Sequence, residues 1–281
     1  MQNDIPPLGE FDVFSDLDNW DDRTAGKWVD ILNQRAASAD QIALRSFILQ
    51  QSAVKYGNKV LELGCGTGRL LADLSRATGS TGQVYGLEPQ RLFASEAERF
   101  LRQQKLDANT RVFVGRAEDI HLPDESIDIC IAQTVLIHIP ADMIPKVFAQ
   151  VRRVVKPGGS FVSVDQDGDT WTIDHPDRET TRKIVRFNSD HRYADGWTGR
   201  YLRRLFKQNG FSDVILSTWT HLDTEGGTYL HSMAQRVAEA AAEHDIISEE
   251  ECRNWLDKLD RLTVEGNFFS SINFFCCQGR K

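Results

Sequence analysis

Residues 60–69 read Val-Leu-Glu-Leu-Gly-Cys-Gly-Thr-Gly-Arg, an apolar run that ends in three alternating glycines. The run Lys59–Leu63 is typical of a short buried strand, and Gly64, Gly66 and Gly68 lie where that strand must turn sharply into a helix. Glycine tolerates positive φ at such a turn and lets the backbone approach a ligand without a Cβ in the way. The stretch therefore indicates a binding site for a nucleoside-type ligand.

The spacing of the glycines separates two classes of ligand. Dinucleotide folds use G-x-G-x-x-G to seat a pyrophosphate at a helix N-terminus, whereas this chain has G-x-G-x-G. Glu62, two residues before the first glycine, would repel a second anion but not a cation. Glu88 ends the next predicted strand, 20 residues after Gly68, where a carboxylate can accept hydrogen bonds from both ribose hydroxyls. The pattern favours a cationic nucleoside over a dinucleotide.

The middle of the chain alternates short β-rich runs with longer amphipathic stretches, which predicts a doubly wound parallel sheet with helices on both faces. After residue 165 this alternation of strands and helices stops. A polar segment runs to about 209, and a strand-like run, a helical insertion and a last apolar run follow it. The first 56 residues look helical. The expected strands are 59–63, 83–87, 111–114, 127–132, 160–164, 213–219 and 272–277, and the expected helices are 69–77, 91–105, 142–155 and the insertion at 227–262.

Composition excludes several classes of protein. The 281 residues include 33 Lys and Arg against 41 Asp and Glu, so the net charge is −8, and no nucleic acid partner is expected. The most apolar segment, 127–139, is too short and too interrupted for a membrane span of about 20 residues. No signal peptide is visible, and the five cysteines are odd in number and lack C-x-x-C spacing. We therefore expect a reduced, cytoplasmic protein.

Four motifs in order resemble class I S-adenosylmethionine-dependent methyltransferases, and within them the small-molecule branch that includes the ubiquinone/menaquinone-biosynthesis C-methyltransferases. These motifs are the glycine-rich stretch 62–68, the acid at the end of the second strand, Gly-Arg-Ala-Glu at 115–118 before 122–128, and Arg-Arg-Val-Val-Lys-Pro-Gly-Gly at 152–159. The resemblance is strong over 57–165. It implies an α/β, Rossmann-like, mostly parallel sheet of seven strands, with 272–277 as an antiparallel edge strand.

The resemblance also implies a division of the chain. Residues 1–56 would form a helical cap and 57–165 the cofactor-binding core. Residues 166–281 would supply substrate-covering segments and the last two strands of the same sheet.

The resemblance assigns roles to individual residues. The three glycines would lie under the methionine part of S-adenosylmethionine, and Glu88 would bind the ribose. Ala117 and Glu118 would border the adenine, with Arg116 where relatives often have an acid. Gln133 would lie beside the reactive methyl group. The positions expected to bind the cofactor are Glu62, Gly64, Cys65, Gly66, Thr67, Gly68, Glu88, Pro89, Ala117, Glu118 and Gln133.

Methyl transfer to a hydroxyl or a carbon acid needs a proton removed, and histidine is the usual base near neutral pH. His138 follows the strand at 127–132 on the side that faces the cofactor. His175, His191 and Tyr193 lie in the segment over the pocket mouth, so we list all four as catalytic candidates. Six aromatic residues fit either an acceptor pocket or the core, and the sequence leaves this open; they are Trp20, Trp28, Trp171, Phe187, Tyr193 and Trp197.

The acidic run at 165–169 suggests a metal site, but an EF-hand loop starting at Asp165 would have Thr170 and Pro176 where it needs glycine and glutamate. No metal is expected.

Our hypothesis is a methyltransferase that moves a methyl group to O, N or C of a small apolar or aromatic metabolite. The alternatives are an NAD(P)-linked oxidoreductase and a non-catalytic S-adenosylmethionine-binding regulator. A nucleic-acid methyltransferase is disfavoured, because 132–135 reads Ala-Gln-Thr-Val and not Asp/Asn-Pro-Pro-aromatic. A homodimer is left open.

Overall fold

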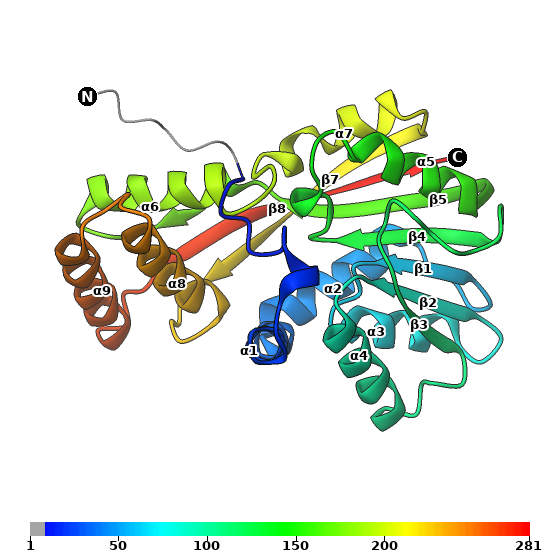
Figure 1. Ribbon diagram of the computed structural model, residues 1–281, viewed down its shortest axis with the longest axis horizontal. Helices are drawn as coiled ribbons and strands as arrows, with labels where there is room; N and C mark the ends of the chain where they lie inside the picture. Colours follow the sequence, from blue (N-terminus) through cyan, green and yellow to red (C-terminus); the bar gives the residue numbers. More distant parts are fainter. Residues whose placement is uncertain (1–8) are drawn as a thin grey trace.

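The computed structural model describes residues 9–281, and its centre is one eight-stranded sheet in the order β3-β2-β1-β4-β5-β8-β6, with β7 paired to β8. The first five strands pair in parallel and fan out on one side of Figure 1. The expected doubly wound α/β fold is confirmed. The strands are β1 (Lys59–Leu63), β2 (Gln83–Glu88), β3 (Thr110–Val114), β4 (Ile127–Gln133), β5 (Val155–Gln166), β6 (Thr172–Ile173), β7 (Ser212–Asp223) and β8 (Ser270–Arg280).

The C-terminal strand β8 lies inside the sheet, so the expectation that 272–277 forms an edge was wrong. β8 pairs antiparallel with β5 on one side and with β7 on the other, which makes β7 the edge strand. β8 is 11 residues long, and only its second part pairs with β5. Its first residues extend beyond β5 and pair with the two-residue β6, which adds an eighth strand to the seven that the resemblance implies.

Helices cover both faces of the sheet because the strand side chains alternate between the faces. On β1, Val60 belongs to one buried core, whereas Leu61 and Leu63 belong to the other. The first core lies under α2, α3, α4, α6, α8 and α9, and the second under α5 and α7. The helices are α1 (Asp22–Ala37), α2 (Ala39–Ser52), α3 (Arg69–Thr78), α4 (Arg91–Gln103), α5 (Ile144–Val154), α6 (Arg178–His191), α7 (Thr198–Gln208), α8 (Tyr229–Glu243) and α9 (Glu249–Val264).

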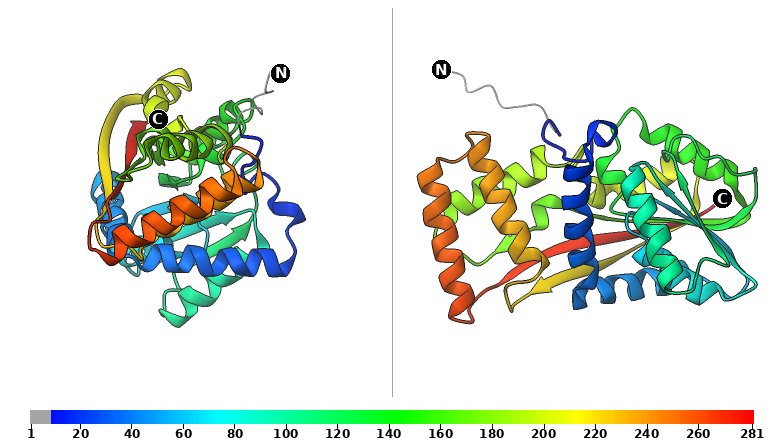
Figure 2. Two further views of the ribbon diagram at one scale, coloured as in Figure 1. Left: turned by 90° about the vertical axis from the view of Figure 1, so that its left-hand side faces the viewer. Right: turned by 60° about the horizontal axis from the view of Figure 1, so that its bottom comes forward.

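The N-terminal helices have different places in the fold. Leu44 and Ile48 of α2 are fully buried in the same core as β1, so α2 is one of the helices that cover the sheet. Helix α1 lies between the strands of the parallel sheet and a lobe formed by α6, α8 and α9 (Figures 1 and 2). The expected boundary at residue 56 therefore separates α2 from the core with which it packs. The three-part division of the chain stays a prediction.

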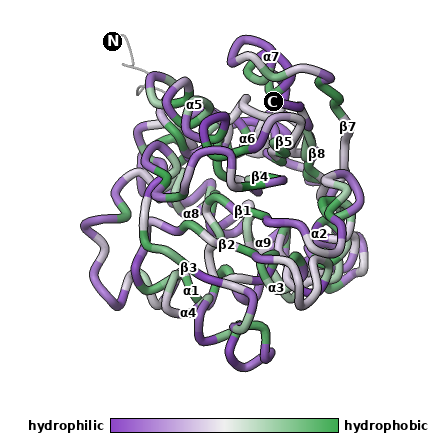
Figure 3. Tube along the Cα trace, turned by 90° about the vertical axis from the view of Figure 1, so that its right-hand side faces the viewer, coloured by the Kyte–Doolittle hydropathy of each residue, from purple (hydrophilic) through white to green (hydrophobic). Residues whose placement is uncertain are grey.

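The lobe of α6, α8 and α9 forms from the two segments for which the sequence predicted only a polar stretch and a helical insertion. The insertion at 227–262 is two helices, and Ser248 begins the second of them with a capping box that it shares with Glu251. Trp255 of α9 is fully buried there. Figure 3 shows apolar residues in the strands at the middle of the fold and mostly hydrophilic loops around them. Over residues 9–281, none of the helices combines the length and the apolar character needed to cross a membrane.

Candidate functional site

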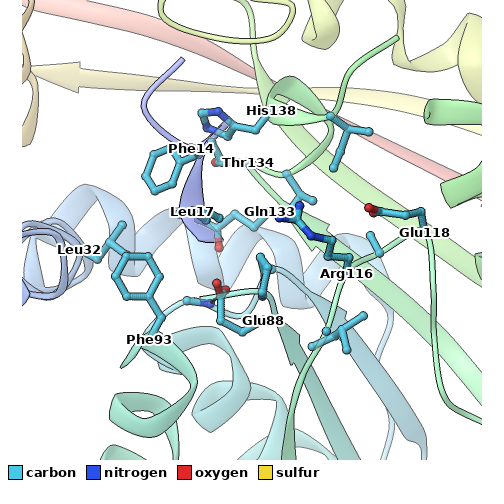
Figure 4. Close-up of a pocket in the computed structure, with 18 of the residues that line it drawn as sticks. Phe14, Leu17, Leu32, Glu88, Phe93, Arg116, Glu118, Gln133, Thr134 and His138 are labelled. Atoms are coloured by element: carbon cyan, nitrogen blue, oxygen red, sulfur yellow. Dashed lines mark hydrogen bonds between the residues drawn. The ribbon is translucent and has the colours of Figure 1, made fainter. Parts of the chain in front are cut away.

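The main pocket opens at the carboxyl ends of β1, β2 and β4, where ligands bind in open α/β sheets. β1 pairs with β2 on one side and β4 on the other, so the connections that follow these strands diverge and leave a crevice. The crevice encloses about 190 Å³. Its walls, most of them drawn in Figure 4, come from Gly64, Gly66, Glu88, Pro89, Phe93, Arg116, Ala117, Glu118, Gln133, Thr134, Val135, His138 and Ile139, and from the N-terminal segment through Phe14, Leu17, Leu32 and Arg35.

The glycine loop forms the floor of this pocket. A Cβ on Gly64 would lie 2.6 Å from Cγ2 of Val135, so the loop packs closely against the segment after β4. Gly66 has a φ of +50°, and within 4 Å a Cβ there would meet, of the described residues, only Leu32, at 3.9 Å across the pocket. The amide of Gly66 donates a hydrogen bond of 2.8 Å to Glu88. The loop therefore leaves open space above its backbone, as a bound ligand requires.

Glu88 sits at the end of β2 with its carboxylate directed into the pocket (Figure 4). It is 4% exposed, and its two oxygens accept hydrogen bonds from the amides of Gly66, at 2.8 Å, and Gln90, at 3.0 Å. Burial raises the pKa of Glu88 to about 7. A carboxylate fixed in this way is suited to accept hydrogen bonds from vicinal hydroxyls.

Glu62 is buried beneath a smaller cavity that adjoins the glycine loop, and Cys65 and Thr67 line the same cavity. One carboxylate oxygen of Glu62, Oε2, has no hydrogen-bond partner in the part of the chain that the structure describes. Burial, reinforced by the charge of Glu88, raises the pKa of Glu62 well above its ordinary value. A buried acid with an unpartnered oxygen is a suitable place for a donor or a cation.

Gly68 has a packing role and does not line either cavity. It precedes α3 with a φ of +82°, and a Cβ there would lie 2.9 Å from Cβ of Ala97 on α4. We expect Gly68→Ala to lower the free energy of unfolding by about 2–4 kcal/mol, from left-handed strain and overpacking together. Urea denaturation measures this. Gly158→Ala is the control, because Gly158 has a φ of +77° and no atom of residues 9–281 lies within 4 Å of its Cβ position. Equal losses of stability in the two variants would contradict the packing role.

The segment after β3 forms the opposite wall. Ala117 is buried, and Arg116 and Glu118 line the pocket beside it. The guanidinium of Arg116 pairs with Asp18 at 2.5 Å, so this arginine links the wall to the N-terminal segment. Phe93 and Leu17 add apolar surface near Glu88 (Figure 4).

His138 lies at the far end of the pocket, hydrogen-bonded to an acid that the sequence did not indicate. Its Nδ1 is 2.9 Å from Oδ1 of Asp12, which is 4% exposed and also accepts from the amides of Phe14 and Ala194. Within residues 9–281, Nδ1 is the only ring nitrogen of His138 with a hydrogen bond. Asp12 lies 126 residues from His138 in a segment without any motif, so only the fold could reveal the pair.

Tyr193, another of the four candidates, lies near His138. Their ring centroids are 5.4 Å apart. Gln166 donates a hydrogen bond of 2.5 Å to the Tyr193 hydroxyl, and burial raises the pKa of this phenol. Tyr193 lines a second cavity of about 70 Å³, called here the inner cavity, which shares Phe14 and His138 with the main pocket.

His175 and His191 line neither the main pocket nor the inner cavity. Both ring nitrogens of His175 are engaged, Nε2 with the carbonyl of Trp255 at 3.1 Å and Nδ1 with the amide of Asp177 at 3.0 Å. The ring of His191 is buried and packs near Phe187 in the lobe. His191 ends α6, and His175 lies before that helix and is hydrogen-bonded to α9.

The aromatic residues divide between pocket and core. Trp28 lines the inner cavity, and Trp20 stacks on it with ring centroids 5.9 Å apart. Trp171 and Phe187 are buried in the core. Trp197 is 45% exposed beneath the guanidinium of Arg200. The sequence missed Phe14 and Phe93 as pocket residues, since neither belongs to a motif.

The acidic side chains at 165 and 167 make hydrogen bonds and an ion pair within the protein. Asp165 accepts hydrogen bonds from Ser163 and from the amide of Ile137, and burial raises its pKa to about 6. Asp167 pairs with Arg200. In residues 9–281 no group of three or more His, Cys, Asp or Glu side chains is placed to hold a metal ion.

Comparison with known proteins places this geometry in a family. Residues 60–159 match the family model described as a methyltransferase domain. An uncharacterized 37.1 kDa protein in transposon TN4556 of Streptomyces fradiae is 31% identical over 88% of this chain and 69% of that protein. The demethylmenaquinone methyltransferase of Lactobacillus johnsonii is 26% identical over 77% of this chain and 90% of its own length.

Among solved structures, YcgJ of Bacillus subtilis has a TM-score of 0.59 at 20% identity, over 84% of this chain and 97% of its own, and so shares the fold. The family match and the relatives favour methyl transfer over the NAD(P)-linked oxidoreductase. Together with the glycine loop at the end of β1, they show that the chain is an enzyme of the class I S-adenosylmethionine-dependent methyltransferases.

Proposed function

We propose that this methyltransferase acts on a small acceptor with an apolar ring system, bound between the glycine loop and the Asp12–His138 pair. The observation that carries the proposal is the continuity of the main pocket. Its walls run from Gly66 and Glu88 at one end to His138 at the other, with Gln133 between them. A nucleoside site and a basic residue thus share one crevice.

The residues present fit S-adenosylmethionine. The open space above Gly66 suits a close backbone contact, and the unpartnered oxygen of buried Glu62 suits the donor groups of the methionine part. We assign Glu88 to the ribose. The other assignments are Gly64, Cys65, Gly66 and Thr67 to the methionine part, Pro89, Phe93, Ala117 and Glu118 to the adenine, and Gln133 to the reacting end. Gly68 supports the loop through packing. When bound, the cofactor supplies a methyl group on a positively charged sulfur.

The lining of the two cavities supports a ring-bearing acceptor. Phe14 and Leu32 belong to both cavities, Ile139 lines the main pocket, and Trp28 and Met233 line the inner cavity. Aromatic and aliphatic walls of this kind bind flat apolar groups. Relatives named for demethylmenaquinone and for 2-phytyl-1,4-naphthoquinone point to the same chemistry. We therefore propose a quinol or phenol as the acceptor class, with methylation at O or C.

His138 is proposed as the base that removes the acceptor proton. Asp12 accepts a hydrogen bond from Nδ1, which leaves Nε2 as the basic nitrogen. Asp165 fixes the start of the turn that carries His138, through the amide of Ile137. The walls of the pocket hold the acceptor in line with the methyl group, and orientation of this kind contributes about 7–11 kcal/mol to catalysis.

We further propose that the acceptor is a free metabolite and not a nucleic acid, and that the enzyme works in the cytoplasm. The net charge of −8 supports the first point, since phosphate backbones bind basic surfaces. The five free and buried thiols support a reducing compartment.

Methyl-labelled S-adenosylmethionine tests the proposal. We expect the label to move to 1,4-naphthohydroquinone or to a simple phenol, and S-adenosylhomocysteine, the demethylated product, to bind in the micromolar range by calorimetry. Ethanolamine is the matched polar acceptor without a ring. Transfer only to ethanolamine would reject the acceptor class, and tight binding of a nicotinamide dinucleotide in place of S-adenosylhomocysteine would reject the proposed pocket.

A further inference from the structure

The inner cavity holds a group of arginines that the proposed reaction does not use. Arg35, Arg192 and Arg236 all line it, together with Asn188 and Tyr193. They come from three elements that are far apart in the sequence, and Figure 1 shows α1, α6 and α8 around the same region. The cavity also shares Arg35 and His138 with the main pocket.

Two of these arginines interrupt the apolar face of a helix. On α8, Tyr229, Met233, Arg236 and Val237 all line the cavity at the spacing of one helical face. Trp28, Ile31, Leu32 and Arg35 do the same on α1. Arg192 directly follows α6, as its C-cap. A cation on a face that is otherwise apolar needs a counter-charge or a ligand.

The arginines have no carboxylate partner within 4 Å among residues 9–281. Among residues 9–281, Arg35 makes one long hydrogen bond, 3.4 Å to Oγ1 of Thr134, and its guanidinium lies over the ring of Tyr229, 4.7 Å from the centroid. Its Nε has no hydrogen-bond partner in the same part of the chain. In the same part of the chain, Arg192 and Arg236 donate no side-chain hydrogen bond. The nearby carboxylate of Asp12 is already occupied by His138 and two backbone amides.

Two buried polar side chains beside these arginines each have one polar atom without a partner among the described residues. Asn188 and Gln166 are each 1% exposed, yet Nδ2 of Asn188 and Oε1 of Gln166 have no hydrogen-bond partner within residues 9–281. Burial lowers the pKa of Arg192; the like charge of Arg236 acts in the same direction, and Tyr193, Asp12 and Glu243 oppose it without reversing it. Helix C-termini favour a cation at Arg35 and Arg192, but Arg236 lies in the middle of α8 and has no such support.

We propose that the inner cavity binds an oxyanion carried by the methyl acceptor, a carboxylate in the first place, through Arg192, Arg236 and Arg35. This rests on the proposed function and narrows its acceptor to an acidic aromatic compound. Guanidinium groups bind carboxylates through paired charge-assisted hydrogen bonds, and Asn188 adds a further donor. The ring of such an acceptor would extend from the inner cavity toward His138, because both cavities share that residue.

Calorimetry with 4-hydroxybenzoate and 4-hydroxybenzamide, in the presence of saturating S-adenosylhomocysteine, tests the inference. The two compounds have the same shape and differ in charge. We expect the wild type to bind the acid about tenfold more tightly than the amide, and Arg192→Gln and Arg236→Gln each to remove most of that preference. Their affinity for the amide and for S-adenosylhomocysteine should stay unchanged. Arg253→Gln, on the exposed side of α9, is the control.

Equal binding of the acid and the amide by the wild type, or an unchanged preference in both arginine variants, would overturn the inference. Phenyl phosphate in place of 4-hydroxybenzoate distinguishes the two oxyanions; tighter binding of the phosphate would move the assignment from carboxylate to phosphate. Arg236→Lys keeps the charge and should retain part of the preference. Failure of S-adenosylhomocysteine to bind the wild type would instead count against the proposed function.

Discussion

Glu88→Ala is expected to weaken the binding of S-adenosylhomocysteine at least tenfold, because it removes the charged acceptor proposed for the ribose hydroxyls. The amides of Gly66 and Gln90 hold the carboxylate at 2.8 and 3.0 Å, so it needs no reorientation on binding. Calorimetry measures the dissociation constant. Glu98→Ala, at an exposed site on α4, is the control and should bind as the wild type does.

The same residue gives the binding a pH dependence. Burial raises the pKa of Glu88 to about 7 in the free protein, and the carboxylate is the form that accepts two hydroxyl protons. Affinity should therefore fall as the pH is lowered through about 7, by about tenfold per unit well below it. Glu88→Gln should bind weakly with no such slope. A wild-type affinity that is constant from about pH 6 to 8 would contradict the role of Glu88.

Measurements of stability show whether a Glu88 variant binds weakly because it has lost the carboxylate or because it is unfolded. The folded pKa of Glu88 is above its ordinary value of 4.5, so its contribution to stability is complete below that pH and is lost as the pH rises through about 7. At pH 8 the free wild type keeps a buried carboxylate, and Glu88→Gln removes it. The NH₂ group of glutamine cannot accept from an amide, so the variant loses one of the two hydrogen bonds that Gly66 and Gln90 make to Glu88. Relief of the buried charge offsets this loss, and we expect the stability at pH 8 to change by less than about 2 kcal/mol. Thermal unfolding without cofactor measures the difference.

Local rules were enough to predict the glycine loop and Glu88. A strand, a turn with positive φ and a helix are encoded within a few residues, and parallel pairing then brings the ends of β1 and β2 to one edge of the sheet. Leu70, Leu71 and Leu74 on α3 repeat at helical spacing, so this helix too could be read from the sequence. The predicted helix boundaries differ from the structure by about two residues, as fraying at helix ends leads one to expect.

Features that depend on distant segments could not be predicted in this way. The apolar run at 272–277 is consistent with either an edge or an interior strand. Only its pairing with β7 shows that it is an interior strand. Leu44 and Ile48 give α2 the pattern of any amphipathic helix. That pattern does not predict that α2 packs on β5 and β8. The contact between Asp12 and His138 spans 126 residues, and no spacing within either segment encodes it.

His138→Ala is expected to lower kcat by about 10²–10⁴-fold toward an acceptor that must lose a proton, which is the usual contribution of a general base. The KM for S-adenosylmethionine should change little, because Glu88 and the glycine loop are untouched. Initial rates with the phenol or quinol acceptor measure this. His121→Ala is the matched control, since the side chain of His121 is 80% exposed.

Asp12→Asn tests how the base is held. The aspartate accepts two backbone amides as well as Nδ1 of His138, so asparagine keeps the shape but loses the charge that favours the protonated imidazole during transfer. We expect kcat to fall less than in His138→Ala, because asparagine can still orient the imidazole but no longer stabilises its charged form. If instead His138→Ala left transfer to a phenol intact, the pocket would work by orientation alone, and the histidine would serve only to pack against Phe14.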